Sequence, residues 1–170
     1  MSFDISLCDP VTMEAIEINE PHFIRGGTYA IGGSTELWLN ITYNYSHYYS
    51  EAHEGGIRSI YGKTGLETIN IFADMIASIE SKYKDIHGKW IVSKRTRNIF
   101  FDKDGTTIDS AQALILALRG EEVSSESEEY FISEGDTTDY WEATAANAIR
   151  PLYQLMTFAK MRPDGVWDGD

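Results

Sequence analysis

The segment that most constrains the fold is LETINIFADMIASIESKY, residues 66–83. Thr64 lies just before this segment and Glu67 lies in its first turn, three residues later, which is the spacing of a capping box. We therefore expect a helix to begin just after Thr64. Apolar residues recur through the segment at three- and four-residue spacing, the period of one helical face: Leu66, Ile69, Phe72, Ala73, Ile76, Ile79 and Tyr83. A helix with one apolar face must pack against a second layer.

Strand patterns before this helix predict that layer. In FDISLCD, apolar and polar residues alternate with the period of a half-buried strand, and short strands are also expected in MEAIEI and in the glycine-bracketed GGTYAIGG. ELWLNITYN alternates too, with Leu37, Leu39, Ile41 and Tyr43 on one face and Trp38, Asn40, Thr42 and Asn44 on the other. Strands and helices are therefore segregated, and we predict an α+β fold in which an antiparallel sheet from the N-terminal half packs against two or three helices.

The C-terminal half is predicted to add a β-hairpin and two helices. KWIVSKRTRNIFFD indicates two strands joined near residues 93–96, and DSAQALILALRG indicates a buried helix capped by Asp109 and ended by Gly120. The acidic, serine-rich residues 121–129 are typical of a mobile loop. A last helical region, DYWEATAANAIRPLYQLMTFAKM, contains Pro151, where we expect a kink or a break.

Charge excludes one class of function. The chain has 170 residues and a net charge of -13, which argues against direct binding to a nucleic-acid backbone. Residues 82–103 are the exception, with seven basic and two acidic residues. This stretch is either a solvated basic hairpin or a local contact for an anion or a partner. Cys8 is the only cysteine, and neither a signal peptide nor a membrane-spanning run is visible, so a cytoplasmic setting is expected.

One short motif suggests an enzyme. NIFFDKDGTTIDS resembles the first motif of the haloacid-dehalogenase-like phosphatases, and this resemblance implies a nucleophile at Asp102, a general acid/base at Asp104 and Mg²⁺ on the carboxylates. GDTTD is similar to the last acidic motif of that family. The flanking segments are too short for the parallel sheet of that fold. The alternative is that Asp-Gly forms a turn and Asp109 caps the next helix, without a bound cation.

Other sites for a metal or a cofactor have little support. GKTG lacks the spacing of a P-loop, the four histidines lack metal-ligand spacing, and one cysteine cannot build a structural zinc site. We therefore predict no metal, no cofactor and no catalytic constellation that the sequence can identify.

Polar and aromatic stretches carry a wider resemblance. GGTY, LNITYNYS, GIRSIYGKTG, DYWEAT and MRPDGVWDGD resemble motifs of a family of small uncharacterised proteins from bacteria and their phages. The resemblance implies a single domain over residues 1–170 in which 82–133 is an insertion. It also implies a bacterial or phage setting, but it supplies no reaction.

These stretches also give the candidate binding residues. We predict that one polar and aromatic cleft is lined by His22, Arg25, Asn40, Asn44, Tyr48 and Trp141. The arginine between Pro-His and Gly-Gly suits a planar anion. The alternative is structural: the arginine pairs with a carboxylate, the asparagines satisfy backbone groups, and the tyrosines pack with their hydroxyls outward.

Four tyrosines in TYNYSHYYS, residues 42–50, raise the question of what this segment holds. We expect Tyr43 to continue the buried strand face. Tyr48 and Tyr49 fall in a helical turn, where adjacent side chains diverge by about 100°, so we expect at least one of them to be exposed.

Two functions follow. We favour a non-enzymatic acidic binding protein of phage or mobile-element type that docks on a host protein, for instance a basic nucleic-acid-binding one, as a counter-defence inhibitor would. The alternative is an enzyme acting on a nucleotide or a phosphorylated small molecule, through Asp102 and Asp104 or through a cleft of His22, Arg25 and Asn44.

Overall fold

The computed structural model describes residues 2–22 and 33–170, and the chain divides into two compact units. The first unit combines the described residues of Met1–Ile91 with Ser133–Asp170, and the second is Val92–Ile132. Helices combine with antiparallel strands, so the α+β class is confirmed. The expectation that the sheet comes from the N-terminal half alone is wrong, because residues 166–169 add a strand to it. The second unit falls inside residues 82–133, the stretch that the family resemblance marks as an insertion.

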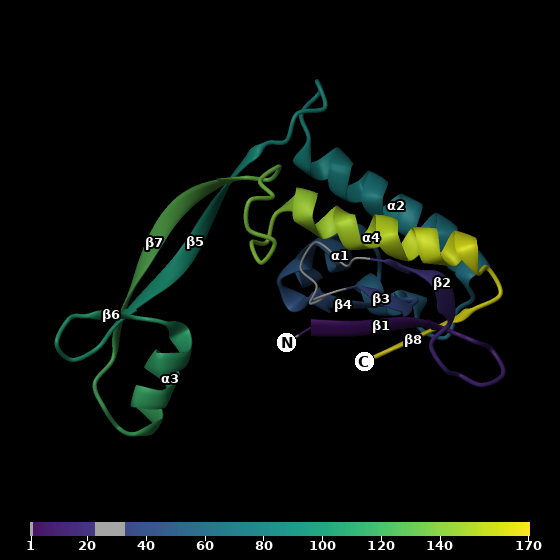
Figure 1. Ribbon diagram of the computed structural model, residues 1–170. Helices are drawn as coiled ribbons and strands as arrows, with labels where there is room; N and C mark the ends of the chain where they lie inside the picture. The colour runs from purple at the N-terminus through teal and green to yellow at the C-terminus, as the bar shows by residue number, and fades with distance from the viewer. Residues whose placement is uncertain (1, 23–32) are drawn as a thin grey trace. The chain divides into compact units, whose positions relative to one another are not determined.

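A three-stranded antiparallel sheet forms one layer of the first unit (Figure 1). Its central strand is β1 (Ser2–Cys8), flanked by β4 (Trp38–Thr42) and β8 (Val166–Gly169). The period-two alternation predicted for the first strand is confirmed, because the register places buried residues opposite one another: Phe3 with Ile41, Ile5 with Leu39, and Leu7 with Trp167.

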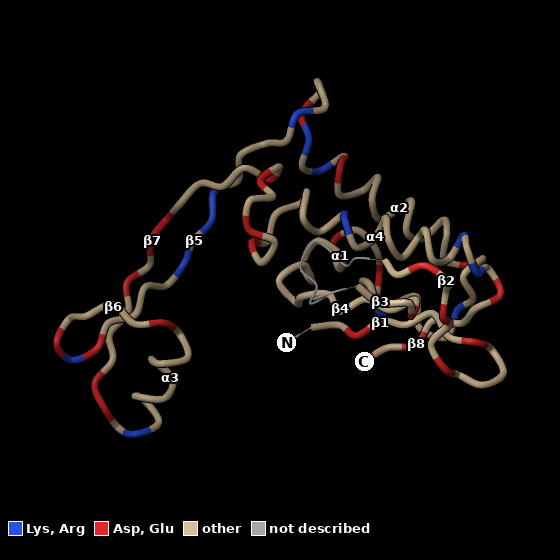
Figure 2. The backbone as a smooth tube through the Cα atoms, in the orientation of Figure 1, with Lys and Arg blue, Asp and Glu red and all other residues tan. Residues whose placement is uncertain are grey.

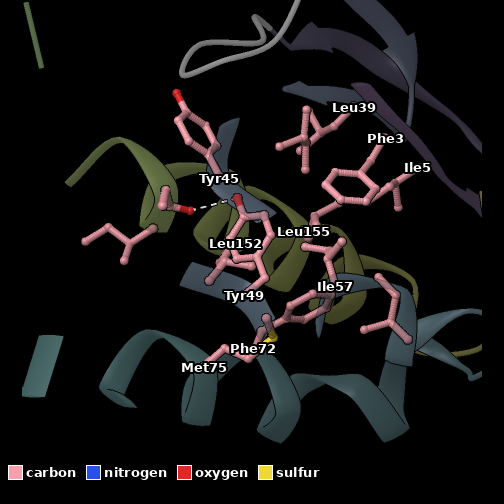
Figure 3. Packing of buried hydrophobic residues seen from close by; sticks show 14 of the residues in the cluster. Phe3, Ile5, Leu39, Tyr45, Tyr49, Ile57, Phe72, Met75, Leu152 and Leu155 are labelled. Carbon is pink, nitrogen blue, oxygen red and sulfur yellow. Dashed lines mark hydrogen bonds between the residues drawn. The ribbon is translucent and has the colours of Figure 1, made fainter. Parts of the chain in front are cut away.

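Helices form the second layer. The long helices α2 (Gly65–Tyr83) and α4 (Ala145–Met161) pack on each other, and the short α1 (Ser46–Ala52) contacts both. Sheet and helices share one core, part of which Figure 3 shows. The predicted capping box at the start of α2 is confirmed: the Thr64 side chain accepts from Glu67 N–H, and the Glu67 carboxylate accepts from Thr64 N–H.

Smaller elements complete the first unit. Strand β2 (Glu17–His22) pairs antiparallel with β3 (Ser34–Glu36). Two 3₁₀ helices, η1 (Tyr43–Tyr45) and η2 (Gly56–Ile60), flank α1. The strand expected in GGTYAIGG lies outside the described residues, apart from its last glycine.

The second unit is a small sheet with one helix. Its strands lie in the order β6 (Thr107–Ile108), β5 (Val92–Phe101), β7 (Ser124–Ser133), and the helix is α3 (Ser110–Leu118). Figure 2 shows that β5 carries basic residues and β7 acidic ones. Ion pairs join these strands, among them Lys94 with Glu129 and Arg97 with Glu128, each at 2.6 Å.

Three sequence predictions for this unit are wrong. Residues 93–96 form no turn, because β5 runs through them as one strand; an exposed strand tolerates polar residues on both faces. Residues 124–129 belong to strand β7 and not to a mobile loop, since basic residues of β5 pair with the carboxylates. Helix α3 is not buried, because a unit of about forty residues cannot cover every side of an apolar helix.

Helix α4 differs from its prediction in one respect. Pro151 lies inside α4, and the helix continues through it without a break. Proline removes one backbone donor, and burial of the surrounding apolar residues in the core offsets that loss. Among the described residues, no helix is long and apolar enough to cross a membrane.

Candidate functional site

The segment TYNYSHYYS leaves the sheet earlier than its alternation suggests. Strand β4 ends at Thr42, whose hydroxyl accepts from Asn44 N–H and starts η1. Tyr43 is therefore not on the buried strand face: it is half-buried, packs against Phe3 with the two rings tilted by 60°, and accepts a hydrogen bond from Arg58. The expectation of a buried strand tyrosine at this position is wrong, because the chain turns one residue sooner.

The three remaining tyrosines are all buried. Tyr45, Tyr48 and Tyr49 are at most 1% exposed, so the expectation that Tyr48 or Tyr49 would be exposed is also wrong. Adjacent side chains do diverge on α1, but both directions are covered. Tyr48 packs edge-on against Tyr83 of α2 at 5.1 Å between ring centroids, and Tyr49 faces α4 (Figure 3).

The hydroxyls of these tyrosines hold the segment that leads into α4. Tyr45 donates to the carbonyl oxygen of Tyr140. Tyr49 donates to Ala148 at 3.0 Å, the bond drawn in Figure 3. Burial raises the pKa of both phenols well above the ordinary value of 10. Both groups therefore stay neutral and remain donors at physiological pH.

Tyr48 adds a buried carboxyl group to this arrangement. Its hydroxyl donates to the Glu134 carboxylate at 2.6 Å and also lies 2.8 Å from the carbonyl oxygen of Ala143. The same carboxylate oxygen accepts from Ala145 N–H at 2.9 Å, at the first turn of α4. Glu134 is fully buried, and no motif in the sequence singled it out.

Further bonds fix residues 136–147 from within. Asp139 accepts from Trp141 N–H at 2.9 Å, and Asn147 donates to the carbonyl oxygens of Asp139 and Glu142. Thr144 caps α4 by accepting from Asn147 N–H. The segment is thus held both by its own side chains and by the tyrosines of η1 and α1.

This rigid segment presents two aromatic side chains to solvent. Tyr140 and Trp141, here called the aromatic pair, are 39% and 41% exposed, with ring centroids 5.0 Å apart. Asn44 supports the pair by donating to the carbonyl oxygen of Trp141 at 2.8 Å. Asp136 and Asp139, both exposed, precede the pair, and Glu142 follows it. The result is an exposed aromatic surface beside carboxylates.

The other predicted site residues do not join the aromatic pair. Asn40 donates to the Ser2 hydroxyl and the Asp4 carboxylate across the sheet, and not to the backbone groups that the structural alternative expects. His22 bonds through Nε2 to the carbonyl oxygen of Glu36, and its ring packs against Phe158 at 4.9 Å. Arg25 lies outside the described residues. Tyr48 contributes from the core, and among the predicted residues only Asn44 and Trp141 contact each other in the described part of the chain.

Tyr140 was missed as a site residue, although it stands directly before Trp141 in the sequence. Their neighbouring positions did not indicate a shared site, because in a helix or a strand the side chains of two consecutive residues point in different directions. Their rings come together here because Asp139 forms a turn at this point.

The phosphatase-like motif forms a turn and a helix cap, as the alternative interpretation predicted. Asp102 accepts from the N–H groups of Asp104 and Thr106, and the turn joins β5 to β6 in an antiparallel hairpin. Asp109 and Gln112 form a capping box for α3. In the described residues, no three His, Cys, Asp or Glu side chains converge to hold a metal ion.

The basic stretch 82–103 is largely neutralised by ion pairs. Lys82 pairs with Glu51 and Lys84 with Glu80, in addition to the pairs between β5 and β7. These pairs favour a solvated, internally balanced surface over an anion site.

Comparisons of the chain with protein families, with curated proteins and with solved structures found no match.

Proposed function

We propose that this protein is a small, acidic, non-enzymatic binding protein that docks on a basic surface of another protein. The observation that carries the proposal is the aromatic pair, which is exposed, rigidly held and flanked by carboxylates. Exposed tryptophan and tyrosine dominate binding energy at protein interfaces.

Rigidity increases what such a pair can contribute. Tyr45 and Asn44 hold the backbone of Tyr140 and Trp141 through hydrogen bonds to their carbonyl oxygens before any partner arrives. Little conformational entropy is then lost on binding, so more of the contact energy appears as affinity. This role also accounts for three of the four tyrosines of TYNYSHYYS: Tyr45, Tyr48 and Tyr49 support the segment that carries the aromatic pair.

Charge determines the kind of partner. A net charge of -13 steers the chain towards a positively charged surface, and Asp136, Asp139 and Glu142 lie where lysine or arginine of the partner would meet the aromatic rings. A basic nucleic-acid-binding protein has such a surface.

The biological setting is part of the proposal. The motifs that resemble those of bacterial and phage proteins suggest a host protein in the bacterial cytoplasm as the partner, with inhibition of host defence as the role. The single cysteine supports a reducing compartment.

The test compares the wild type with the double variant Tyr140→Ala/Trp141→Ala. Each immobilised protein is exposed to host lysate, and proteins retained only by the wild type are identified, purified and titrated by calorimetry. We expect a basic partner whose affinity falls by about 100-fold or more in the double variant and weakens with added salt.

Tyr153→Ala is the matched control. This tyrosine is 46% exposed on α4 in the same unit, so its loss should leave binding unchanged. A partner that binds the double variant as tightly as it binds Tyr153→Ala and the wild type would refute the proposal. An affinity that does not change with salt concentration would refute it too.

A further inference from the structure

Helix α3 presents a continuous apolar surface that the sequence led us to expect inside a core. Leu114, Ile115 and Leu118 are 61%, 49% and 79% exposed. Together with Ala111, also exposed, they occupy positions i, i+3, i+4 and i+7 of one helical face, here called the outward stripe. Among the described residues of the helix, only Ala113 is fully buried.

A groove lies beside this stripe within the same unit. It has a volume of about 420 Å³ and is lined by apolar side chains of α3, β5 and the residue before β7, with three serines at its margin: Phe100, Ala113, Leu114, Ala117 and Val123, with Ser110, Ser124 and Ser125. The surface therefore contains both projecting leucines and a hollow of apolar character. Exposed apolar surfaces of this kind mark interaction sites.

We propose that the outward stripe and its groove bind a second copy of this chain, with α3 antiparallel to its counterpart. A two-fold symmetric contact requires one surface that complements itself. The stripe can meet this requirement because it is apolar along its whole length and can therefore pack on a copy of itself. The proposal concerns a different surface from the aromatic pair and does not depend on the proposed function.

Charge supports the antiparallel arrangement. The stripe contains no charged residue, but Asp109 lies at the N-terminal end of α3 and Arg119 at its C-terminal end. Antiparallel pairing brings Arg119 of each copy to Asp109 of the other and also opposes the two helix dipoles favourably. A parallel pairing would bring like charges together.

The edge strand β7 carries charges that disfavour a dimer formed along it. Strand β7 lies at an edge of its sheet and carries Glu126, Glu128 and Glu129. Two copies that joined along this edge would place these carboxylates opposite one another, and like charges directly across strands are destabilising. The carboxylates of β7 therefore disfavour self-association along this edge, whereas the stripe on α3 carries no charge.

Analytical ultracentrifugation tests the proposal with the full chain. Three leucine or isoleucine side chains per copy form a small interface, so we expect a dissociation constant on the order of 100 µM. Over ~10 µM to ~1 mM protein, the mass should rise from 19.2 kDa towards twice that value. Association should strengthen from ~0.05 to ~0.5 M NaCl, because salt screens the repulsion between two acidic chains.

Two variants locate the contact. Leu118→Glu should weaken association by at least about tenfold. Leu66→Glu, which changes an equally apolar residue that is 67% exposed on α2, should leave it unchanged. Circular dichroism checks that both variants remain folded.

Cysteine cross-linking tests the orientation. In an antiparallel pair, residue 111 of one copy faces residue 118 of the other. Ala111→Cys mixed with Leu118→Cys should form a disulfide-linked dimer in oxidised glutathione faster than either variant alone. Native Cys8 is buried and its thiol pKa is raised by that burial, so it does not compete.

Several outcomes would overturn the inference. A mass that stays at 19.2 kDa at every concentration would do so, as would a dimer that survives Leu118→Glu. A monomeric wild type whose binding to a different protein depends on Leu118 would assign the groove to that protein.

Discussion

Buried tyrosines should make this protein lose stability in alkali more steeply than its charge alone requires. Burial raises the folded-state pKa of Tyr45 and Tyr49 above the ordinary value of 10, and both side chains are fully covered. The folded chain thus retains these protons more tightly than the unfolded chain. The stabilisation is fully present below pH 10 and is lost as the pH rises above it.

The magnitude follows from the one-unit interval between pH 10 and pH 11. In that interval the unfolded chain releases each phenolic proton and the folded chain keeps it, which costs about 1.4 kcal/mol of unfolding free energy per group. Two groups give about 3 kcal/mol at pH 11, relative to pH 8. Tyr61, whose pKa burial raises to about 12, shifts stability in the same direction by less, since it is partly exposed.

Tyr49→Phe isolates one of these groups. At pH 8 the variant loses the hydrogen bond to Ala148 and should be about 1 kcal/mol less stable than the wild type. At pH 11 it lacks the group that would penalise the folded state, so the two proteins should have nearly equal stability. Lysines and exposed tyrosines titrate alike in both proteins and cancel in the difference.

Urea unfolding at pH 8, 9, 10 and 11, followed by circular dichroism, measures this difference directly. Ionisation of tyrosine, followed by its absorbance near 295 nm, should occur together with unfolding for the buried groups. A stability difference that does not change with pH would show that the Tyr49 hydroxyl is not held in the core as described.

Three substitutions probe other contacts, each by urea unfolding at pH 7. Gly65→Ala should cost about 2 kcal/mol or more, because a Cβ there would lie 2.6 Å from the carbonyl oxygen of Arg162; an unchanged midpoint would contradict that packing. Trp167→Phe should cost about 2 kcal/mol or more, because it removes the buried 2.7 Å bond to Thr68 and leaves a cavity beside the smaller ring; an unchanged midpoint would contradict this contact. Asp102→Ala should cost about 1 kcal/mol through the lost turn bonds and leave calorimetric titration with Mg²⁺ unchanged, whereas a metal-dependent difference would revive the phosphatase interpretation.

The sequence predicted correctly those elements that depend on interactions between residues close together in the chain. The capping box at Thr64 and Glu67 places the start of α2, and Asp109 with Gln112 places the start of α3. The alternation of apolar residues in β1 gives the face that is buried. In each case the residues that decide the structure lie within a few positions of one another.

The predictions that are wrong depended on partners far away in the sequence. Tyr48 is buried because Glu134 and Tyr83, 86 and 35 positions away, cover it. Strand β7 is ordered because β5 supplies cations for its carboxylates. Conversely, α3 has the composition of a core helix, but its unit has too few residues to cover it. No local pattern contains this information.

The sequence predicted only part of the candidate site, because its residues also meet through contacts between distant positions. Asn44 and Trp141 are predicted from the polar and aromatic stretches of the sequence, and they are joined by a hydrogen bond across 97 positions. Tyr140 becomes a site residue only through the turn at Asp139, and the supporting role of the buried tyrosines follows from where α4 begins.

The pairing of β1 with β8 has a consequence for how the chain folds as it is made. The central strand of the sheet is synthesised first, but Ile5 pairs with Gly169, near the other end of the sequence. At ~5–20 residues per second, roughly ten to thirty seconds separate the two strands on the ribosome. During that time one edge of an apolar strand has no native partner. The first unit therefore completes its sheet only after translation has passed Gly169, and contacts this distant in sequence are slow to form.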